Sequence, residues 1–205
     1  MLKTNRIAFK EWASIVQALA QGEQILILRK GGVHEKGKTF GVSYTEFFLF
    51  PTFEHQNQKD LKPRGQKLLQ ETLLKYQPSS QPFPRETGRG LGWGVPIRYY
   101  CAVENSFWIS DEKALRELEA FHIWSWDSIK ARFDWGEEKG IFGIIVRVFS
   151  LPETVTLENL KRYGGCRSWV ELENSLGTGS LKPVLSEPLF QARQEKIAKL
   201  LGSLT

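Results

Sequence analysis

The sequence contains little cysteine and no long apolar run, and each absence excludes a class of protein. Two cysteines in 205 residues are too few for a disulfide scaffold or a zinc site with four cysteine ligands. No stretch approaches the roughly 18 apolar residues of a membrane helix. The first residues are interrupted by Lys10 and Glu11, unlike the apolar core of a signal peptide. We therefore expect a cytoplasmic protein with no membrane partner, and a buried free thiol at Cys101.

Recognisable catalytic motifs are also missing. A restriction-type nuclease core needs an Asp, then an acidic residue, one intervening position and a lysine on the following strand, to hold Mg²⁺ and a water. Neither Asp111-Glu112-Lys113 nor Glu137-Glu138-Lys139 has that spacing. No turn resembles the elbow that carries a serine or cysteine nucleophile. The sequence favours a protein without catalysis of its own and without a cofactor.

A basic, glycine-containing loop follows the apolar run that ends at Leu28. Within it, "GVHEKGKT" from Gly32 to Thr39 formally matches the P-loop pattern G-x-x-x-x-G-K-[S/T]. A P-loop requires a helix directly afterwards, because the helix N-terminus holds the phosphates, whereas Phe40 to Tyr44 favours a strand. We interpret the segment as a loop between strands whose lysines can contact phosphate. An NTPase that uses Lys38 and Thr39 is an alternative.

Hydrophobic patterning predicts the main elements of a single domain over residues 1–205. Apolar residues at helical spacing predict a helix from about Ile7 to Ala20. Two strands, over 25–28 and 42–50, are expected to pair across the basic loop. Further predictions are a hairpin over 97–109 that turns at Glu104-Asn105, a strand over 141–149 and a helix over 188–201.

These elements interleave irregularly, and hairpin signals outnumber βαβ units. The segment "QPSSQPFPRETGRGLGWGVP" is rich in proline and glycine and predicts a mobile loop at about 77–96. We expect an α+β fold with a mixed or mostly antiparallel sheet, or a partly closed barrel, with flanking helices.

Positive charge is concentrated in one part of the chain. The formal net charge is +5, and residues 59–98 contain eight cations against three acidic residues, which equals the excess of the whole chain. Cations bind phosphates and an exposed ring can stack on an unpaired base. We predict contacts to DNA or RNA from Lys30, Lys36, Lys38, Arg64, Arg89, Trp93 and Arg98. A protein-binding module that docks a partner near Trp93 is an alternative.

Two histidines and a carboxylate provide the other alternative. His34, Glu54 and His55 have the donor types that zinc or iron prefers. Neighbours on a strand point to opposite faces, so Glu54 and His55 do not have a typical ligand spacing. The register of the first predicted hairpin decides whether His34 lies near them. A metal-dependent, nuclease-like hydrolase stays open on this basis.

Long stretches of the chain resemble one known family. The strings "AFKEWASIVQALAQGEQILILRKGGVHE", "EFFLFPTFEHQ", "HIWSWDSIKARF", "GIIVRVFSLP" and "RYGGCRSWVEL" are similar to the domain-of-unknown-function 1802 family, which is bacterial and largely cyanobacterial. The resemblance covers nearly the whole chain and implies no catalytic residue. Association of some members with restriction-endonuclease-type domains implies a role beside DNA, in restriction or defence. The strand over 141–149 with "LPETVTLENL" is also similar to PUA-like barrels that read modified bases.

Overall fold

The computed structural model describes residues 1–30, 43–53, 56–75, 90–165 and 167–202, with the backbone alone for Lys75 and residues 90–93. The elements in chain order are β1 (Thr4–Trp12), α1 (Ala13–Ala20), β2 (Leu26–Arg29), β3 (Glu46–Thr52), η1 (Gln58–Asp60), α2 (Pro63–Lys75), β4 (Gly90–Ile109), α3 (Glu112–Glu117), η3 (Leu118–Phe121), α4 (Trp126–Asp134), β5 (Ile141–Leu160), η4 (Lys161–Tyr163), β6 (Trp169–Gly177), β7 (Lys182–Pro183) and α5 (Glu187–Gly202).

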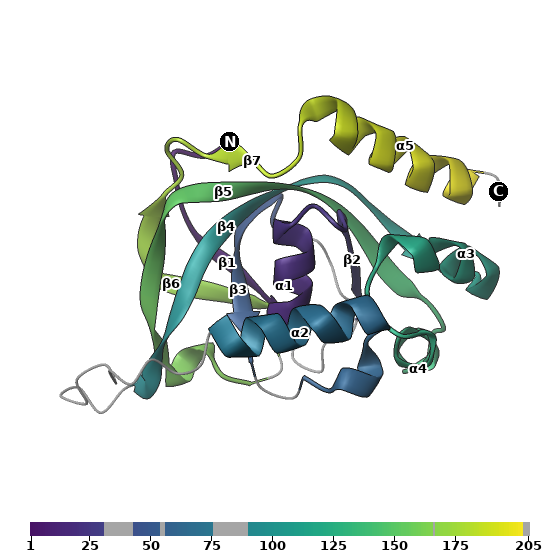
Figure 1. Ribbon diagram of the computed structural model, residues 1–205, viewed down its shortest axis with the longest axis horizontal. Helices are drawn as coiled ribbons and strands as arrows, with labels where there is room; N and C mark the ends of the chain where they lie inside the picture. The colour runs from purple at the N-terminus through teal and green to yellow at the C-terminus, as the bar shows by residue number, and fades with distance from the viewer. Residues whose placement is uncertain (31–42, 54–55, 76–89, 166, 203–205) are drawn as a thin grey trace.

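The strands form one curved, open sheet around a central helix (Figure 1). Its order is β2-β5-β4-β3-β1-β6, and the short β7 pairs with β5. Strands β1 and β3 are parallel, whereas the other pairs are antiparallel. The predicted α+β fold with a mixed sheet and flanking helices is therefore confirmed.

Strands β4 and β5 are 20 residues long each, several times the usual strand length of about 5–6 residues. Their pairing is interrupted between Gly90 and Gly94, between Ile97 and Tyr99, and between Val103 and Asn105. Such bulges bend a strand and increase its twist. The long hairpin therefore curves far enough to contribute to two separate hydrophobic clusters.

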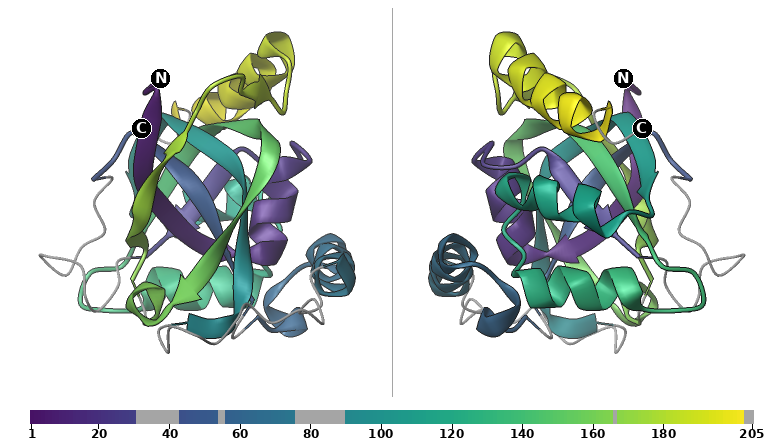
Figure 2. Two further views of the ribbon diagram at one scale, coloured as in Figure 1. Left: turned by 90° about the vertical axis from the view of Figure 1, so that its left-hand side faces the viewer. Right: turned by 90° about the vertical axis from the view of Figure 1, so that its right-hand side faces the viewer.

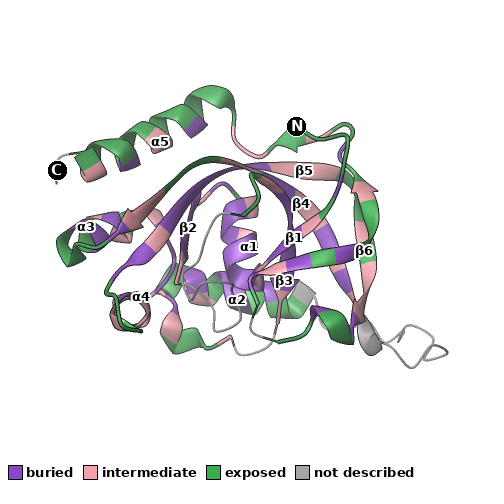
Figure 3. Cartoon of the chain, turned by 180° about the vertical axis from the view of Figure 1, so that it is seen from behind, coloured by how far each residue is buried: buried purple, intermediate pink, exposed green. Residues whose placement is uncertain are grey.

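Helix α1 lies inside the curve of the sheet and is almost wholly buried (Figures 2 and 3). Its buried residues are Ala13, Ser14, Ile15, Val16, Ala18 and Leu19. Helix α2 covers it from outside, and α3 and α4 extend the larger hydrophobic cluster. At roughly 25 cal/mol per Å² of buried apolar surface, this central packing is a main source of stability.

Strand β3 explains the apolar run Phe47 to Phe50. Phe47 and Leu49 point into the larger cluster with α1. Phe48 and Phe50 point into a second cluster, made with β6 and the distal half of the long hairpin. Because both faces of β3 are covered, its sequence does not alternate between polar and apolar residues.

The two edge strands of the open sheet approach each other at one end. Arg29, the last residue of β2, donates from Nε to Ser168 Oγ at 3.2 Å, directly before β6. Its Nη1 lies 3.5 Å from Oε2 of Glu11 in β1, and Glu11 is buried with 2% of its surface exposed. Side-chain contacts thus bridge the gap that backbone pairing leaves open.

The prediction of a helix over residues 7–20 is wrong in its first half. Residues 7–12 belong to β1, and α1 begins only at Ala13. Ala8 and Phe9 lie in different hydrophobic clusters, so the strand is covered on both faces. The helical spacing of apolar residues therefore extends from β1 into α1, although the chain changes from strand to helix between Trp12 and Ala13.

The two predicted strands of the first hairpin do not pair with each other. β2 pairs with β5, and β3 pairs with β1 and β4. In the sheet, β5 and β4 lie between them. The sequence prediction that His34 could lie near Glu54 and His55 depended on pairing of these two strands. Because the strands do not pair, that basis for the prediction is lost.

Two further predictions around β4 are wrong. The expected turn at Glu104-Asn105 is only an irregularity within one continuous strand, since Val103 and Asn105 both pair with β5. Residues 90–96 of the expected mobile loop also belong to β4, while residues 77–89 lie outside the described part. Non-local pairing with β5 overrides the turn-forming residues. The strand over 141–149, the helix over 188–201 and the buried free thiol of Cys101 are confirmed.

Candidate nucleic-acid interface

The ammonium group of Lys30 is bound by other groups of the protein. Its ammonium group donates to the carbonyl oxygens of Glu138 at 2.6 Å and Gly140 at 2.7 Å, and lies 5.3 Å from the centre of the Trp108 ring. Burial lowers the pKa of Lys30. These contacts tie the end of β2 to the segment between α4 and β5, so the ammonium is already engaged.

Cations of the basic segment on α2 are partly neutralised. Arg64 Nε lies 2.5 Å from a carboxylate oxygen of Glu23, and Lys67 lies 3.9 Å from Glu71. Exposed pairs of this kind contribute about 0–1 kcal/mol to stability. They nevertheless reduce the positive field that the composition alone suggests.

Arg98 and Lys30 lie far apart. Arg98 is half-buried in the β4 irregularity between Ile97, which pairs with Val155, and Tyr99, which pairs with Ser150. Lys30 follows Arg29, whose partner is Phe142. Eight residues of β5 separate Phe142 from Ser150, or roughly 26 Å along the strand. Of the predicted phosphate contacts that the structure describes, Lys30 and Arg98 therefore do not share one patch.

The remaining predicted positions lie outside the described residues. They are Lys36, Lys38, Thr39 and Arg89 for the phosphate contacts and the NTPase, and His34, Glu54 and His55 for the metal site. Trp93 lies in β4 with its backbone alone described. In the described part of the chain, no three His, Cys, Asp or Glu side chains gather to hold a metal ion. Among the same residues, no helix is long and apolar enough to cross a membrane.

A different surface has the properties of a binding site. An open cleft of about 590 Å³ lies between η1 and α4. Its lining residues are Lys59, Asp60, Ser125, Asp127, Ser128, Ala131, Arg132 and Trp135. Trp135 directly follows α4 and is 52% exposed, which is unusual for so large an aromatic residue.

Arg132 lines this cleft and contacts two tryptophan rings. Its guanidinium carbon lies 3.5 Å from the centre of the Trp124 ring and 5.7 Å from that of Trp12. The two indoles themselves pack at 4.7 Å. Burial lowers the pKa of Arg132, while the nearby carboxylates of Glu11 and Asp60 favour its charged form. A guanidinium remains charged under such conditions.

Arg132 is half-buried and lines the cleft. Among the described residues, its guanidinium contacts the rings of Trp124 and Trp12. A guanidinium carries five N–H donors in a planar fork. The contact with Trp124 restricts the movement of this fork.

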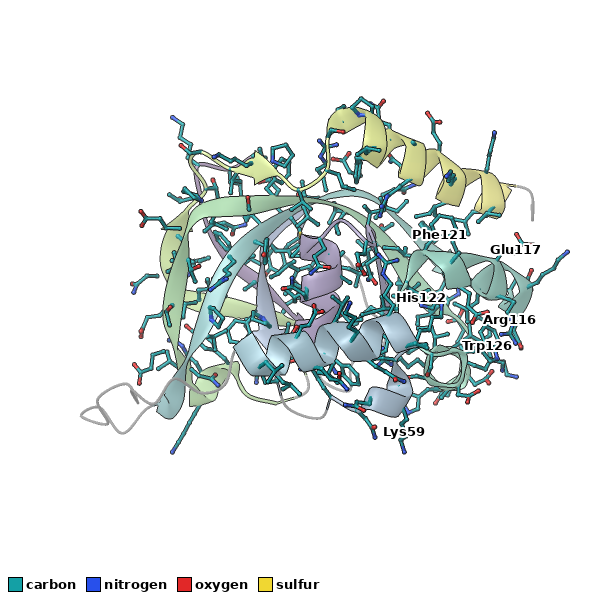
Figure 4. All side chains as sticks on the ribbon, viewed as in Figure 1. Lys59, Arg116, Glu117, Phe121, His122 and Trp126 are labelled. Carbon is teal, nitrogen blue, oxygen red and sulfur yellow. The ribbon has the colours of Figure 1, made fainter. Side chains whose placement is uncertain are left out.

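A second arginine–tryptophan stack lies beside the first. The guanidinium of Arg116 lies 3.4 Å from the ring centre of Trp126, and its Nη1 contacts Glu119 at 3.1 Å. Figure 4 shows His122 beside the N-terminal end of α2, Arg116 and Trp126 further to the right near α3 and α4, and Lys59 below them. One residue of each arginine–tryptophan pair, Trp126 or Arg132, belongs to α4.

His122 is neutral at physiological pH. It is 5% exposed, and neither ring nitrogen makes a hydrogen bond of normal geometry with the described residues. Burial, followed by the charge of Lys62, lowers its pKa to about 3, although the Trp124 backbone offsets part of that shift.

Sequence reasoning missed Arg132 and Trp135 because both lie at the end of an ordinary amphipathic helix. Ile129 and Phe133 show the buried face of α4, and Arg132 lies beside it. A tryptophan directly after a helix, followed by Gly136, is a local signal for an exposed ring. Lys59 did belong to the basic segment that the composition singled out.

The fold and this cleft define an α+β protein with an open, curved sheet around a buried helix. The chain belongs to the family described as Domain of unknown function (DUF1802), whose model matches residues 8–196. Among curated proteins there is no significant match.

Two solved structures are similar to the chain. The crystal structure of ASCH from Zymomonas mobilis has a TM-score of 0.41 and 7% identity, covering 95% of this chain and 94% of that one. The S128A mutant of the same protein has a TM-score of 0.40 and 9% identity, with 98% and 99% covered. At these values the similarity carries no inference about the site.

Proposed function

We propose that the protein binds single-stranded nucleic acid across the cleft between η1 and α4, as an accessory module without catalysis of its own. One observation carries this proposal: Arg132 lines the cleft with its guanidinium carbon 3.5 Å from the centre of the Trp124 ring. Such a fork matches phosphate and the acceptor edge of guanine. Preorganisation reduces the entropy that binding would otherwise lose.

Trp135 supports an unpaired base as the ligand. Its ring is 52% exposed at the rim of the cleft, and stacking of a base on an aromatic side chain contributes about 1–3 kcal/mol. A duplex keeps its bases stacked on each other, so it does not offer a free ring face. The cleft volume of about 590 Å³ lies in the range of roughly 300–1,000 Å³ that small-molecule sites occupy.

Acidic residues in the cleft also fit a base better than phosphate alone. Asp60 and Asp127 line it together with Lys59 and Arg132. Carboxylates accept hydrogen bonds from exocyclic amino groups such as cytosine N4. The mixture of donors and acceptors suits a base edge with a phosphate beside it.

The test is fluorescence anisotropy of labelled single-stranded DNA, single-stranded RNA and duplex DNA, with protein first cleared of carried-over nucleic acid. We expect micromolar or tighter binding of a single-stranded probe. Trp135→Ala should weaken it by about 5- to 150-fold, since stacking contributes about 1–3 kcal/mol. Trp135→Phe should retain most of the affinity, and Arg132→Gln should lose at least about tenfold.

The matched control is Arg162→Gln. Arg162 is exposed on η4 and pairs with Glu173 at 3.3 Å, so the change removes the same charge away from the cleft. It should leave affinity within about twofold. A flat titration on all three probes at low salt, or equal losses in Arg162→Gln and Arg132→Gln, would contradict the proposal.

A further inference from the structure

Asp60, at the end of η1, lines the cleft and is held there by backbone pairing. Its carbonyl oxygen accepts a hydrogen bond from the Ser125 amide at 2.9 Å. The next residue, Leu61, forms an antiparallel bridge with Trp124. The backbone that carries the Asp60 carboxylate is therefore fixed against the segment that leads into α4.

The same pairing places Asp60 close to Arg132. Trp124, the bridge partner of Leu61, is the ring that the Arg132 guanidinium contacts at 3.5 Å. Burial lowers the pKa of Arg132, and Asp60 is one of the two carboxylates that oppose this shift. Asp60 and Arg132 are both half-buried and line one cleft. A hydrogen-bond acceptor and a hydrogen-bond donor thus lie around the same space.

The second carboxylate of the cleft, Asp127, is placed differently. It is exposed and belongs to the first turn of α4, where a negative charge stabilises the positive end of a helix. Its position is thus explained by the helix itself. Asp60 is the carboxylate with the more restricted surroundings, and it is the better candidate for reading a ligand.

A carboxylate next to an arginine distinguishes among the bases. An ionised carboxylate offers two acceptor oxygens and no donor. Guanine presents two adjacent donors, N1–H and the N2 amino group, which such a pair of oxygens can accept. Adenine, cytosine and thymine place an acceptor beside the donor on that edge, and this acceptor repels a carboxylate. Guanine also carries the O6 and N7 acceptors, which are the commonest base partners of arginine.

We infer that the cleft selects guanine among unpaired bases, with Asp60 accepting from N1–H and the N2 amino group and Arg132 donating to O6 and N7. Trp135, which is 52% exposed at the rim, stacks on the ring. The inference rests on the proposed single-strand binding and adds which base occupies the cleft. A site built for particular hydrogen bonds rejects a base that leaves its polar groups unpaired.

The experiment compares labelled pentamers of oligothymidylate that differ in the central base alone, by fluorescence anisotropy. The central base is guanine, hypoxanthine, adenine or cytosine. The guanine pentamer should bind about 5- to 150-fold more tightly than the adenine pentamer, as expected for one good bidentate contact. Hypoxanthine differs from guanine only by the missing N2 amino group, so its pentamer should bind at least about fivefold more weakly than the guanine pentamer.

Asp60→Asn tests the assignment of the carboxylate. The amide keeps the size of the side chain but replaces one acceptor by a donor, and asparagine pairs well with adenine. The ratio of guanine to adenine affinity should therefore fall by at least about tenfold. Because both affinities belong to one protein, a partial loss of folded protein cancels from the ratio. Glu153→Gln is the control, since Glu153 is an exposed residue of β5 that does not line the cleft, and it should keep the ratio within about twofold.

The outcomes separate this inference from the proposed function. If none of the pentamers binds at low salt, single-strand binding and guanine selection both fail. If all four bind within about twofold of each other, single-strand binding stands and guanine selection is overturned. An unchanged ratio of guanine to adenine affinity in Asp60→Asn also overturns the inference, because Asp60 then does not read the base.

Discussion

Arg132 and His122 are both basic side chains near tryptophan, and burial affects them differently. The ordinary pKa of arginine is so high that burial lowers it without removing the charge, and Glu11 and Asp60 favour the charged form. The imidazole of His122 loses its proton instead, because burial and Lys62 both oppose a positive charge. One residue supplies a permanent cation and the other a neutral donor and acceptor.

The low pKa of His122 predicts acid-sensitive stability. Its pKa is lowered from 6.5 to about 3 in the folded protein, so below about pH 6.5 the unfolded chain binds a proton that the folded chain does not. The free energy of unfolding should therefore fall as pH decreases from 6.5 towards 3. The loss from this group between pH 7 and pH 5 is about 2 kcal/mol.

Urea unfolding at pH 7 and pH 5 measures this effect. His122→Asn removes the titrating group and keeps a polar side chain of similar size, so its stability should change less between the two pH values, by about 2 kcal/mol. The difference of differences cancels whatever the substitution costs at pH 7. If both proteins showed the same pH dependence, the pKa of His122 would not be lowered in the folded state, which would contradict the prediction.

At the scale of elements, Glu11 connects β1 to the edge strand β2 across the opening of the sheet. It lies 3.5 Å from Arg29 of β2 and accepts a hydrogen bond from the Trp12 amide at 2.8 Å. Removing one partner of a buried pair typically costs about 3–5 kcal/mol, because the other charge is left uncompensated. Arg29 is 25% exposed, so we expect about 2–4 kcal/mol for Glu11→Ala.

Glu171 provides the matched comparison. It pairs with Arg6 at 3.0 Å between the neighbouring strands β1 and β6, but 63% of its side chain is exposed. Glu171→Ala should change the free energy of unfolding by less than about 1 kcal/mol. Chemical denaturation of both variants measures the contrast. Equal losses would mean that the Glu11–Arg29 contact does not act as a buried bridge.

Elements were predictable from the sequence where local pattern and burial agree. Helix α5 was expected over 188–201 and runs from Glu187 to Gly202. At β1 and α1 the agreement fails, because a strand covered on both faces carries apolar residues at spacings that also fit a helix. Asp111 caps α3 by accepting from the Lys113 amide at 3.0 Å, as its position before Glu112 indicates.

At the scale of the whole molecule, the net charge of +5 overstates the electrostatic contribution to binding. Two cations, Lys59 and Arg132, line the proposed interface together with Asp60 and Asp127. A single strand that contacts two cations should bind with a slope of log affinity against log salt near −1.4, at about −0.7 for each contact. Much of the affinity should therefore persist at 200 mM salt.

Anisotropy titrations at several salt concentrations test this prediction. Lys59→Gln should reduce the steepness of the slope by about 0.7, whereas Trp135→Ala should lower affinity with little change of slope, since stacking releases no counterions. A steep slope of about −5 would instead indicate binding through cations of the basic segment and loop. The interface would then lie elsewhere on the molecule.

The sequence by itself determined the family, the α+β class and the approximate place of helix α5, because these follow from patterns within short windows. It also located Lys59 within the basic segment. Only the tertiary structure decided that β2 pairs with β5, and that Arg132 and Trp124, eight residues apart, stack at a cleft. Strand pairing and the exposure of a side chain depend on contacts between distant parts of the chain, which no local pattern encodes.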